Sequence, residues 1–166
     1  MSLQAARSLL LVALALALTP PAYSQNSAQS GTLEKVKRDG TTVIGYVEGA
    51  APFSSVDASG QPQGYSVDLC RAIAGGIATQ LKIADLKTRW VPLTVQTRLE
   101  AVRAKRVDLE CSTTTWTLQR QALVDFSLIT FVDGANILSL AESRIGRVAD
   151  LAGKRVAVLG GTTTEK

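Results

Sequence analysis

Apolar blocks with two different periods alternate along the chain from Thr32 onward. Apolar runs typical of strands occupy residues 41–47, 86–91, 107–111 and 155–159, and the first of them is rich in β-branched residues. Between them, apolar residues recur at helical spacing in residues 32–38, 66–81 and 94–105, and a further helix starts at Thr117. Ser66 and Thr117 are residue types that cap helices. The alternation predicts an α/β fold, with a mostly parallel sheet and helices on both faces.

The first two dozen residues are predicted to be a secretory signal peptide, not part of the fold. Arg7 precedes an unbroken apolar run at residues 9–18, two prolines end the run, and cleavage is expected after Ser24. The alternative is an N-terminal membrane anchor, but so short a run does not span a bilayer comfortably. Residues 25–31 are small and polar, and we expect a disordered leader there.

Charge and residue usage narrow the classes of function. The net charge of +4 comes from 18 basic and 14 acidic residues without a Lys/Arg cluster, which disfavours nucleic acid as a partner. The chain contains no histidine, which argues against most zinc sites and against nucleophiles activated by histidine. We therefore predict no metal site, no cofactor and no catalytic residue.

The two cysteines, Cys70 and Cys111, would lie in an oxidising compartment after export. Three arrangements are open: the two residues pair with each other, one is a buried free thiol, or Cys111 pairs with a residue outside this chain. One cysteine is expected on a helix and the other at a strand end, so the sequence does not fix the distance between them.

The stretch of residues 110–120, ECSTTTWTLQR, combines a strand end, four hydroxyl residues and a helix start. In parallel α/β sheets, ligands bind beyond the carboxyl ends of the strands. Free main-chain N–H groups at a helix start favour an anion, and Arg120 can add a two-donor fork for a carboxylate. The alternative interpretation is an ordinary helix cap followed by a surface arginine.

Several short motifs in a fixed order resemble one protein family. They are APFS at residues 51–54, GYSVDL at 64–69, the segment 120–127 ending in DFS, ADLAGKRVAV at 149–158 and GGTTTE at 160–165. Together they resemble the periplasmic amino-acid-binding proteins that feed ABC importers. The ECSTTT stretch with QTR at residues 96–98 looks closest to the glutamate/aspartate-binding branch.

The resemblance implies a ligand role for several residues. Arg120 would grip the α-carboxylate of an amino acid, helped by Thr115, and Thr113 would accept a hydrogen bond from the ligand ammonium. Phe53 would pack on the aliphatic part of the ligand. Arg98 would meet a ligand carboxylate in the acidic branch, although an arginine in a helix turn is otherwise more often a solvated surface charge.

The second half of the ligand site would begin with Thr162, which the resemblance places in a second lobe. Where the acidic branch carries a basic residue and a small hydroxyl residue, this chain has Val47 and Val95. Both departures remove polar contacts, so the ligand expected is glutamate, aspartate or a neutral polar amino acid.

The resemblance also implies a domain organisation. Residues 32–132 would form the first lobe of a type II periplasmic-binding-protein fold, and residues 133–140 a hinge strand. Residues 141–166 would only begin the second lobe, so we expect a fragment or a truncated gene product.

Transport is the function that the resemblance implies, with a periplasmic location and a membrane permease as partner. Two alternatives from other classes remain. One is a secreted enzyme on the same fold, of the dehydratase type, which would need an acid or base in the cleft. The other is a receptor lobe that senses an amino acid and signals by closure.

Overall fold

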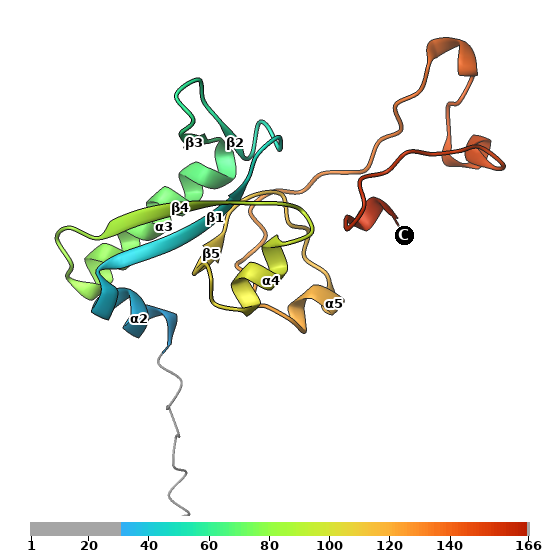
Figure 1. Cartoon of the computed structure of the whole chain (residues 1–166). Helices are drawn as coiled ribbons and strands as arrows, with labels where there is room; N and C mark the ends of the chain where they lie inside the picture. The colour runs from blue at the N-terminus through green and yellow to red at the C-terminus, as the bar shows by residue number, and fades with distance from the viewer. Residues whose placement is uncertain (1–30, 166) are drawn as a thin grey trace, which may run out of the picture. The chain divides into compact units, whose positions relative to one another are not determined.

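A three-stranded parallel sheet forms the centre of the structure, a computed structural model that describes residues 31–165 (Figure 1). Strand β1 (Thr41–Val47) lies between β4 (Lys87–Leu93) and β5 (Leu109–Glu110). β1 pairs with β4 along its whole length and with β5 at Ile44 and Gly45. The predicted signal peptide and all but the last residue of the predicted leader lie outside the described residues.

Helices cover both faces of this sheet, as predicted. Successive side chains of a strand point to opposite faces, and β1 shows this at Val43 and Ile44. Ile44 packs with residues of α3 (Tyr65–Leu81), whereas Val43 packs with Ala101 of α4 (Arg98–Arg103). Strand β1 is thereby buried on both faces, as a central parallel strand requires.

Short elements complete the described chain. Helix α2 (Thr32–Asp39) precedes β1, and α5 (Leu118–Gln121) follows β5. A two-stranded hairpin joins β2 (Ser55–Val56) to β3 (Pro62–Gln63). Three 3₁₀ turns follow, η1 (Ala141–Ser143), η2 (Val148–Leu151) and η3 (Thr163–Glu165). Within residues 31–165, no helix is both long and apolar enough to cross a membrane.

Two predicted helix starts are wrong. Helix α3 begins at Tyr65, with Gly64 at the cap position, and the Ser66 hydroxyl instead donates to the carbonyl oxygen of Ser112 at 2.8 Å. Helix α4 begins at Arg98 instead of Thr94. Thr94 and Thr97 form their own turn, in which each main-chain N–H donates to the hydroxyl of the other residue.

The predicted strand at residues 155–159 is absent from the structure, which has no regular element there. Val156 and Val158 are 53% and 47% exposed, although the sequence suggests a buried run. A strand is stabilised by pairing with a neighbour, and no described strand pairs with this segment. Residues 133–140, predicted to be a hinge strand, also form no strand in the structure, whereas the proposed lobe boundaries at residues 132 and 140 stay predictions.

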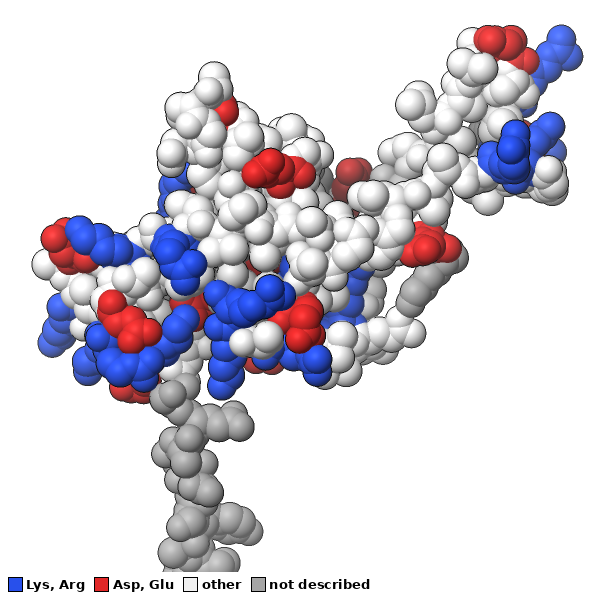
Figure 2. Space-filling model, viewed as in Figure 1, with Lys and Arg blue, Asp and Glu red and all other residues white. Residues whose placement is uncertain are grey.

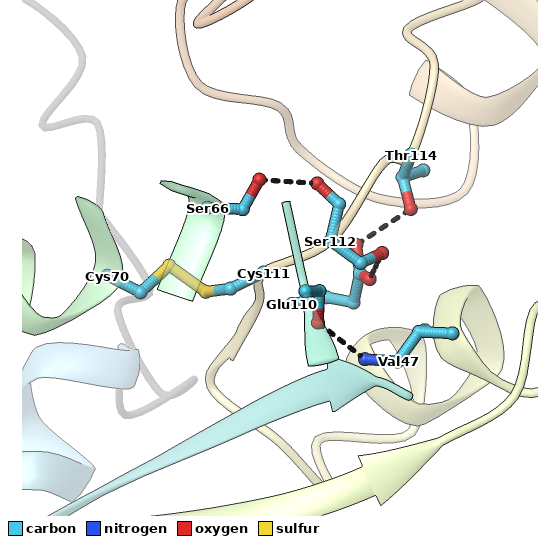
Figure 3. The surroundings of a disulfide bond; sticks show 8 residues. Val47, Ser66, Cys70, Glu110, Cys111, Ser112 and Thr114 are labelled. Atoms are coloured by element: carbon cyan, nitrogen blue, oxygen red, sulfur yellow. Dashed lines mark hydrogen bonds between the residues drawn. A yellow bond between two sulfur atoms is a disulfide. The ribbon is translucent and has the colours of Figure 1, made fainter. Parts of the chain in front are cut away.

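A disulfide joins Cys70 of α3 to Cys111, the residue that follows β5, and so decides between the three arrangements (Figure 3). The bond spans a sequence separation of 41 residues, with a Cα–Cα distance of 6.4 Å. It fixes the start of the hydroxyl-rich loop to the helix that covers one face of the sheet.

Charged side chains of both signs are interspersed on the face shown in Figure 2. Several are paired locally, such as Asp68 with Arg71 and Glu100 with Arg103, each one helical turn apart. Exposed pairs of this kind contribute little to stability. A better buried pair joins Lys35 of α2 to Asp108 at 2.6 Å, and the Asp108 carboxylate also accepts the main-chain N–H of Val43.

Candidate ligand-binding site

A cavity of about 380 Å³ lies beyond the carboxyl ends of the three parallel strands. The loops that follow β1, β4 and β5 border it, together with a segment near residue 160. All six residues predicted to contact a ligand line this cavity: Phe53, Arg98, Thr113, Thr115, Arg120 and Thr162. The structure therefore brings together residues that lie more than 100 positions apart in the sequence, although their roles toward a ligand stay predictions.

Arg120 lies in the single turn of α5, and local sequence explains its position. Thr117 is the N-cap of that helix, and its hydroxyl accepts the main-chain N–H of Arg120 at 3.2 Å, as predicted. The guanidinium donates to the carbonyl oxygens of Thr115 at 2.9 Å and of Gly161 at 3.0 Å. Arg120 is thus held at the border of the cavity by both of its terminal nitrogens.

Arg98 is a buried residue, only 3% exposed, and not the solvated surface charge that its helical position suggested. Its Nη1 donates to the Ser112 hydroxyl at 3.2 Å, while the buried Nε has no hydrogen-bond partner among residues 31–165. Burial lowers the pKa of the Arg98 guanidinium, the Glu110 carboxylate opposes this shift, and Arg120 adds to it. An anion in the cavity would stabilise both cations.

The four consecutive hydroxyl residues divide into two pairs. Thr113 and Thr115 line the cavity, whereas Ser112 and Thr114 donate hydrogen bonds to the carboxylate of Glu110 (Figure 3). The sequence alone did not indicate this role of Glu110. Its position two and four residues before the two hydroxyls was the available signal.

Phe53 packs among aromatic residues at another border of the cavity. Its ring meets the rings of Phe131 and Tyr65 edge to face, at centroid distances of 4.8 and 6.0 Å. The Tyr65 hydroxyl donates to the carbonyl oxygen of Thr130 at 2.9 Å. The aromatic contacts connect the loop after β1 to the segment that precedes the predicted hinge.

Thr162 belongs to the segment near residue 160 that borders the cavity. Its hydroxyl donates to the carbonyl oxygen of Leu159 at 2.6 Å, which shapes a tight turn. The Gln96 amide donates to the carbonyl oxygen of Gly160 at 3.2 Å, so this segment also contacts the loop after β4.

Glu48 lines the same cavity, a position that the sequence did not indicate. Its carboxylate accepts the Tyr46 hydroxyl at 3.4 Å. Burial raises the pKa of Tyr46, and the negative charge and hydrogen bond of Glu48 raise it further. Glu48 thus places a carboxylate beside a cavity that also contains two arginines. Within residues 31–165, no three His, Cys, Asp or Glu side chains are grouped to hold a metal ion.

The family model for bacterial extracellular solute-binding proteins, family 3, matches residues 42–157. The chain belongs to this family. A relative from Pseudomonas aeruginosa, an L-glutamate/L-aspartate-binding protein, is 38% identical over 138 residues, which cover 82% of this chain and 46% of that protein. The chain spans about half the length of the curated relatives it matches.

Solved structures agree with the family assignment and show the type II periplasmic-binding-protein fold, of which this family 3 chain covers a part. A solute receptor for L-cysteine from Neisseria gonorrhoeae matches with a TM-score of 0.65 at 27% identity, covering 81% of this chain and 53% of that one. An arginine-bound domain 1 of the protein TmArgBP matches with a TM-score of 0.50 at 28% identity, covering 60% of this chain and 71% of that domain.

Proposed function

We propose that this chain binds glutamate or aspartate outside the cytoplasm and delivers it to the permease of an ABC importer. The observation that carries this proposal is the placement of Arg98 and Arg120 on one cavity, beside the hydroxyls of Thr113 and Thr115. Guanidinium groups form strong, directional hydrogen bonds with carboxylates. Two such groups suit a ligand with two carboxylates.

The remaining lining residues fit the other parts of such a ligand. The hydroxyl oxygen of Thr113 can accept a hydrogen bond from the ammonium group, and the carboxylate of Glu48 adds negative charge to the same cavity. Phe53 supplies an apolar wall for the methylene groups. Val47 and Val95 also line the cavity and offer no polar contact, which keeps neutral polar amino acids as the competing ligand class.

The comparisons support binding as the function class over catalysis. The Pseudomonas relative carries the name of an L-glutamate/L-aspartate-binding protein. The TmArgBP structure is an arginine-bound single domain, which supports ligand binding by a chain of this extent. We propose further that the chain reaches the periplasm by cleavage of its signal peptide after Ser24, which mass spectrometry of the exported protein would test by the presence of Gln25 at the N-terminus.

An NMR titration of the ¹⁵N-labelled chain tests ligand binding. Glutamate and aspartate should shift the amide signals of Phe53, Thr113, Thr115 and Arg120. Glutarate, which lacks the ammonium, and 4-aminobutyrate, which lacks the α-carboxylate, should bind more weakly. Stronger shifts with glutamine or asparagine would assign the chain to neutral ligands. If no amino acid moves these signals, the proposal is wrong, and conversion of a ligand during the titration would indicate an enzyme.

A further inference from the structure

We infer that Glu110 is the positioning residue of the ligand-binding loop, although it does not line the cavity itself. This inference rests on the proposed function, because it concerns residues that would contact the ligand. The Glu110 carboxylate holds Ser112 and Thr114 on one side of the loop, which leaves Thr113 and Thr115 facing the cavity.

The contacts of Glu110 form a short relay toward one of the two arginines. Nη1 of Arg98 donates to the Ser112 hydroxyl at 3.2 Å, and that hydroxyl donates to one carboxylate oxygen of Glu110. The Thr114 hydroxyl donates to the other carboxylate oxygen at 2.7 Å. An ionised carboxylate only accepts hydrogen bonds. Both hydroxyl protons therefore point to Glu110, and the Ser112 oxygen is free to accept from Arg98.

Glu110 is well suited to position the loop because its main chain is fixed. Glu110 is the last residue of β5 and lies opposite Gly45 of the central strand. The next residue, Cys111, donates its N–H to the carbonyl oxygen of Gly45 at 2.9 Å and is bonded to α3 through Cys70. Ser112 and Thr114 are thus tied to a strand end that is held on both sides.

Two effects of Glu110 on ligand binding have opposite signs, which makes the inference decidable. Its negative charge lies close enough to Arg98 to oppose the shift in the arginine pKa. Removal of that charge would favour an anionic ligand. Removal of the two hydroxyl contacts would release the loop and disfavour the ligand. If Glu110 acts by position, the second effect is the larger one.

Ligand titrations of Glu110→Gln and Glu110→Asp separate these effects. Glutamine lacks one of the two accepting oxygens, and aspartate keeps the charge but is one methylene too short to reach both hydroxyls. We expect both variants to bind glutamate at least about tenfold more weakly, the loss typical of one or two hydrogen bonds. Glu100→Gln is the matched control, because Glu100 forms an exposed pair with Arg103 and does not line the cavity. The affinity of this variant for glutamate should stay unchanged. Parent-like or tighter binding by Glu110→Gln would overturn the inference.

A double-mutant cycle distinguishes positioning from a general structural role. If Glu110 acts through the two hydroxyls, Glu110→Gln should weaken binding much less in a Ser112→Ala/Thr114→Val background than in the parent, since groups in one network are not additive. Full additivity of the two losses would contradict the inference, whatever the melting temperatures show.

A readout without ligand separates this inference from the proposed function. In the free Glu110→Gln chain, the side-chain Nε–H signal of Arg98 and the amide signals of Thr113 and Thr115 should shift and broaden, and in Glu100→Gln they should not. If these signals stay unchanged, the positioning role is wrong. If they change while the parent binds no amino acid, only the proposed function fails.

Discussion

Arg120 and Gly161 are joined by a hydrogen bond of 3.0 Å, from the guanidinium Nη2 to the carbonyl oxygen. The Nη1 of the same guanidinium donates to the carbonyl oxygen of Thr115 at 2.9 Å. One planar group therefore connects the loop after β5 to the segment near residue 160 that borders the cavity. A guanidinium has five N–H donors, so it can make both contacts and still offer a donor to a ligand carboxylate.

Replacement of this fork by a point charge should weaken ligand binding. We expect Arg120→Lys to lose about 1.5–3 kcal/mol of binding free energy, the value of a hydrogen bond to a charged group. The NMR titration with glutamate measures this loss as a higher dissociation constant. Arg103→Lys is the matched control, since Arg103 forms an exposed pair with Glu100 and does not line the cavity. An unchanged dissociation constant for Arg120→Lys would exclude Arg120 from the site.

The Cys70–Cys111 disulfide should stabilise the first part of the fold. The bond links residues 41 positions apart, and closing a loop of that size restricts the unfolded chain. We expect Cys70→Ser/Cys111→Ser to lose about 2–5 kcal/mol of unfolding free energy, measured by urea denaturation. The parent chain with a reductant should unfold at the midpoint of the double variant. If reductant leaves the parent midpoint unchanged, the bond does not form or does not stabilise the fold.

The turn between β2 and β3 should loosen in acid because of Asp57. Its carboxylate accepts hydrogen bonds from the hydroxyl and N–H of Ser59 and from the N–H of Gln61. These contacts hold the pKa of Asp57 below its ordinary value, with the Ser59 hydroxyl as the largest cause. Because the pKa of Asp57 is lower in the folded state, its ionised carboxylate stabilises the folded chain at pH values above the unfolded-state pKa of about 4. This stabilisation is lost as the pH falls through the folded-state pKa.

An NMR pH titration of the Asp57 carboxyl checks this cause. Ser59→Ala should raise the pKa of Asp57, because it removes the hydroxyl donor. Gln61→Ala should leave that pKa low, because the contact comes from its main-chain N–H. Equal pKa values in the parent and in Ser59→Ala would show that the hydroxyl is not the cause.

Local sequence predicted the features of the fold that depend on neighbouring residues. The cap of α5 needs only Thr117 and a main-chain N–H three residues later, and both are evident from the sequence. The strand runs at Thr41–Val47 and Lys87–Leu93 have the expected composition, and Pro92 is tolerated near the end of β4 because this strand lies at a sheet edge. The predicted gathering of three loops at the carboxyl ends of the strands followed from the parallel topology of the sheet.

Features that depend on distant partners could not be predicted from local sequence. Ser66 looked like a cap, but its hydroxyl bonds to Ser112, 46 residues away. Residues 155–159 have the composition of a strand, but pairing with a neighbouring strand decides whether one forms. The role of Glu110 depended on which hydroxyls face the cavity, and that is set by the backbone between β5 and α5.

Gly64 lies against the main chain of Phe53, which makes it the most constrained glycine beside the site. A Cβ at position 64 would lie 2.5 Å from the Phe53 carbonyl oxygen, and the φ of +119° is one that L side chains rarely adopt. The N–H groups of Tyr65 and Ser66 donate to the carbonyl oxygens of Pro52 and Phe53 at 3.0 Å. The contact therefore holds the phenyl ring of Phe53 at the border of the cavity.

Gly64→Ala should both destabilise the chain and weaken ligand binding. We expect a loss of about 1–3 kcal/mol of unfolding free energy from steric overlap and backbone strain, and a lower affinity because Phe53 must move. Gly60→Ala is the matched control, since Gly60 also has a positive φ, of +79°, but nothing lies within 4 Å of its Cβ position. Backbone strain alone should cost Gly60→Ala about 1–2 kcal/mol and leave affinity unchanged. If the two variants bind glutamate equally well, the approach of Gly64 to Phe53 does not shape the ligand site.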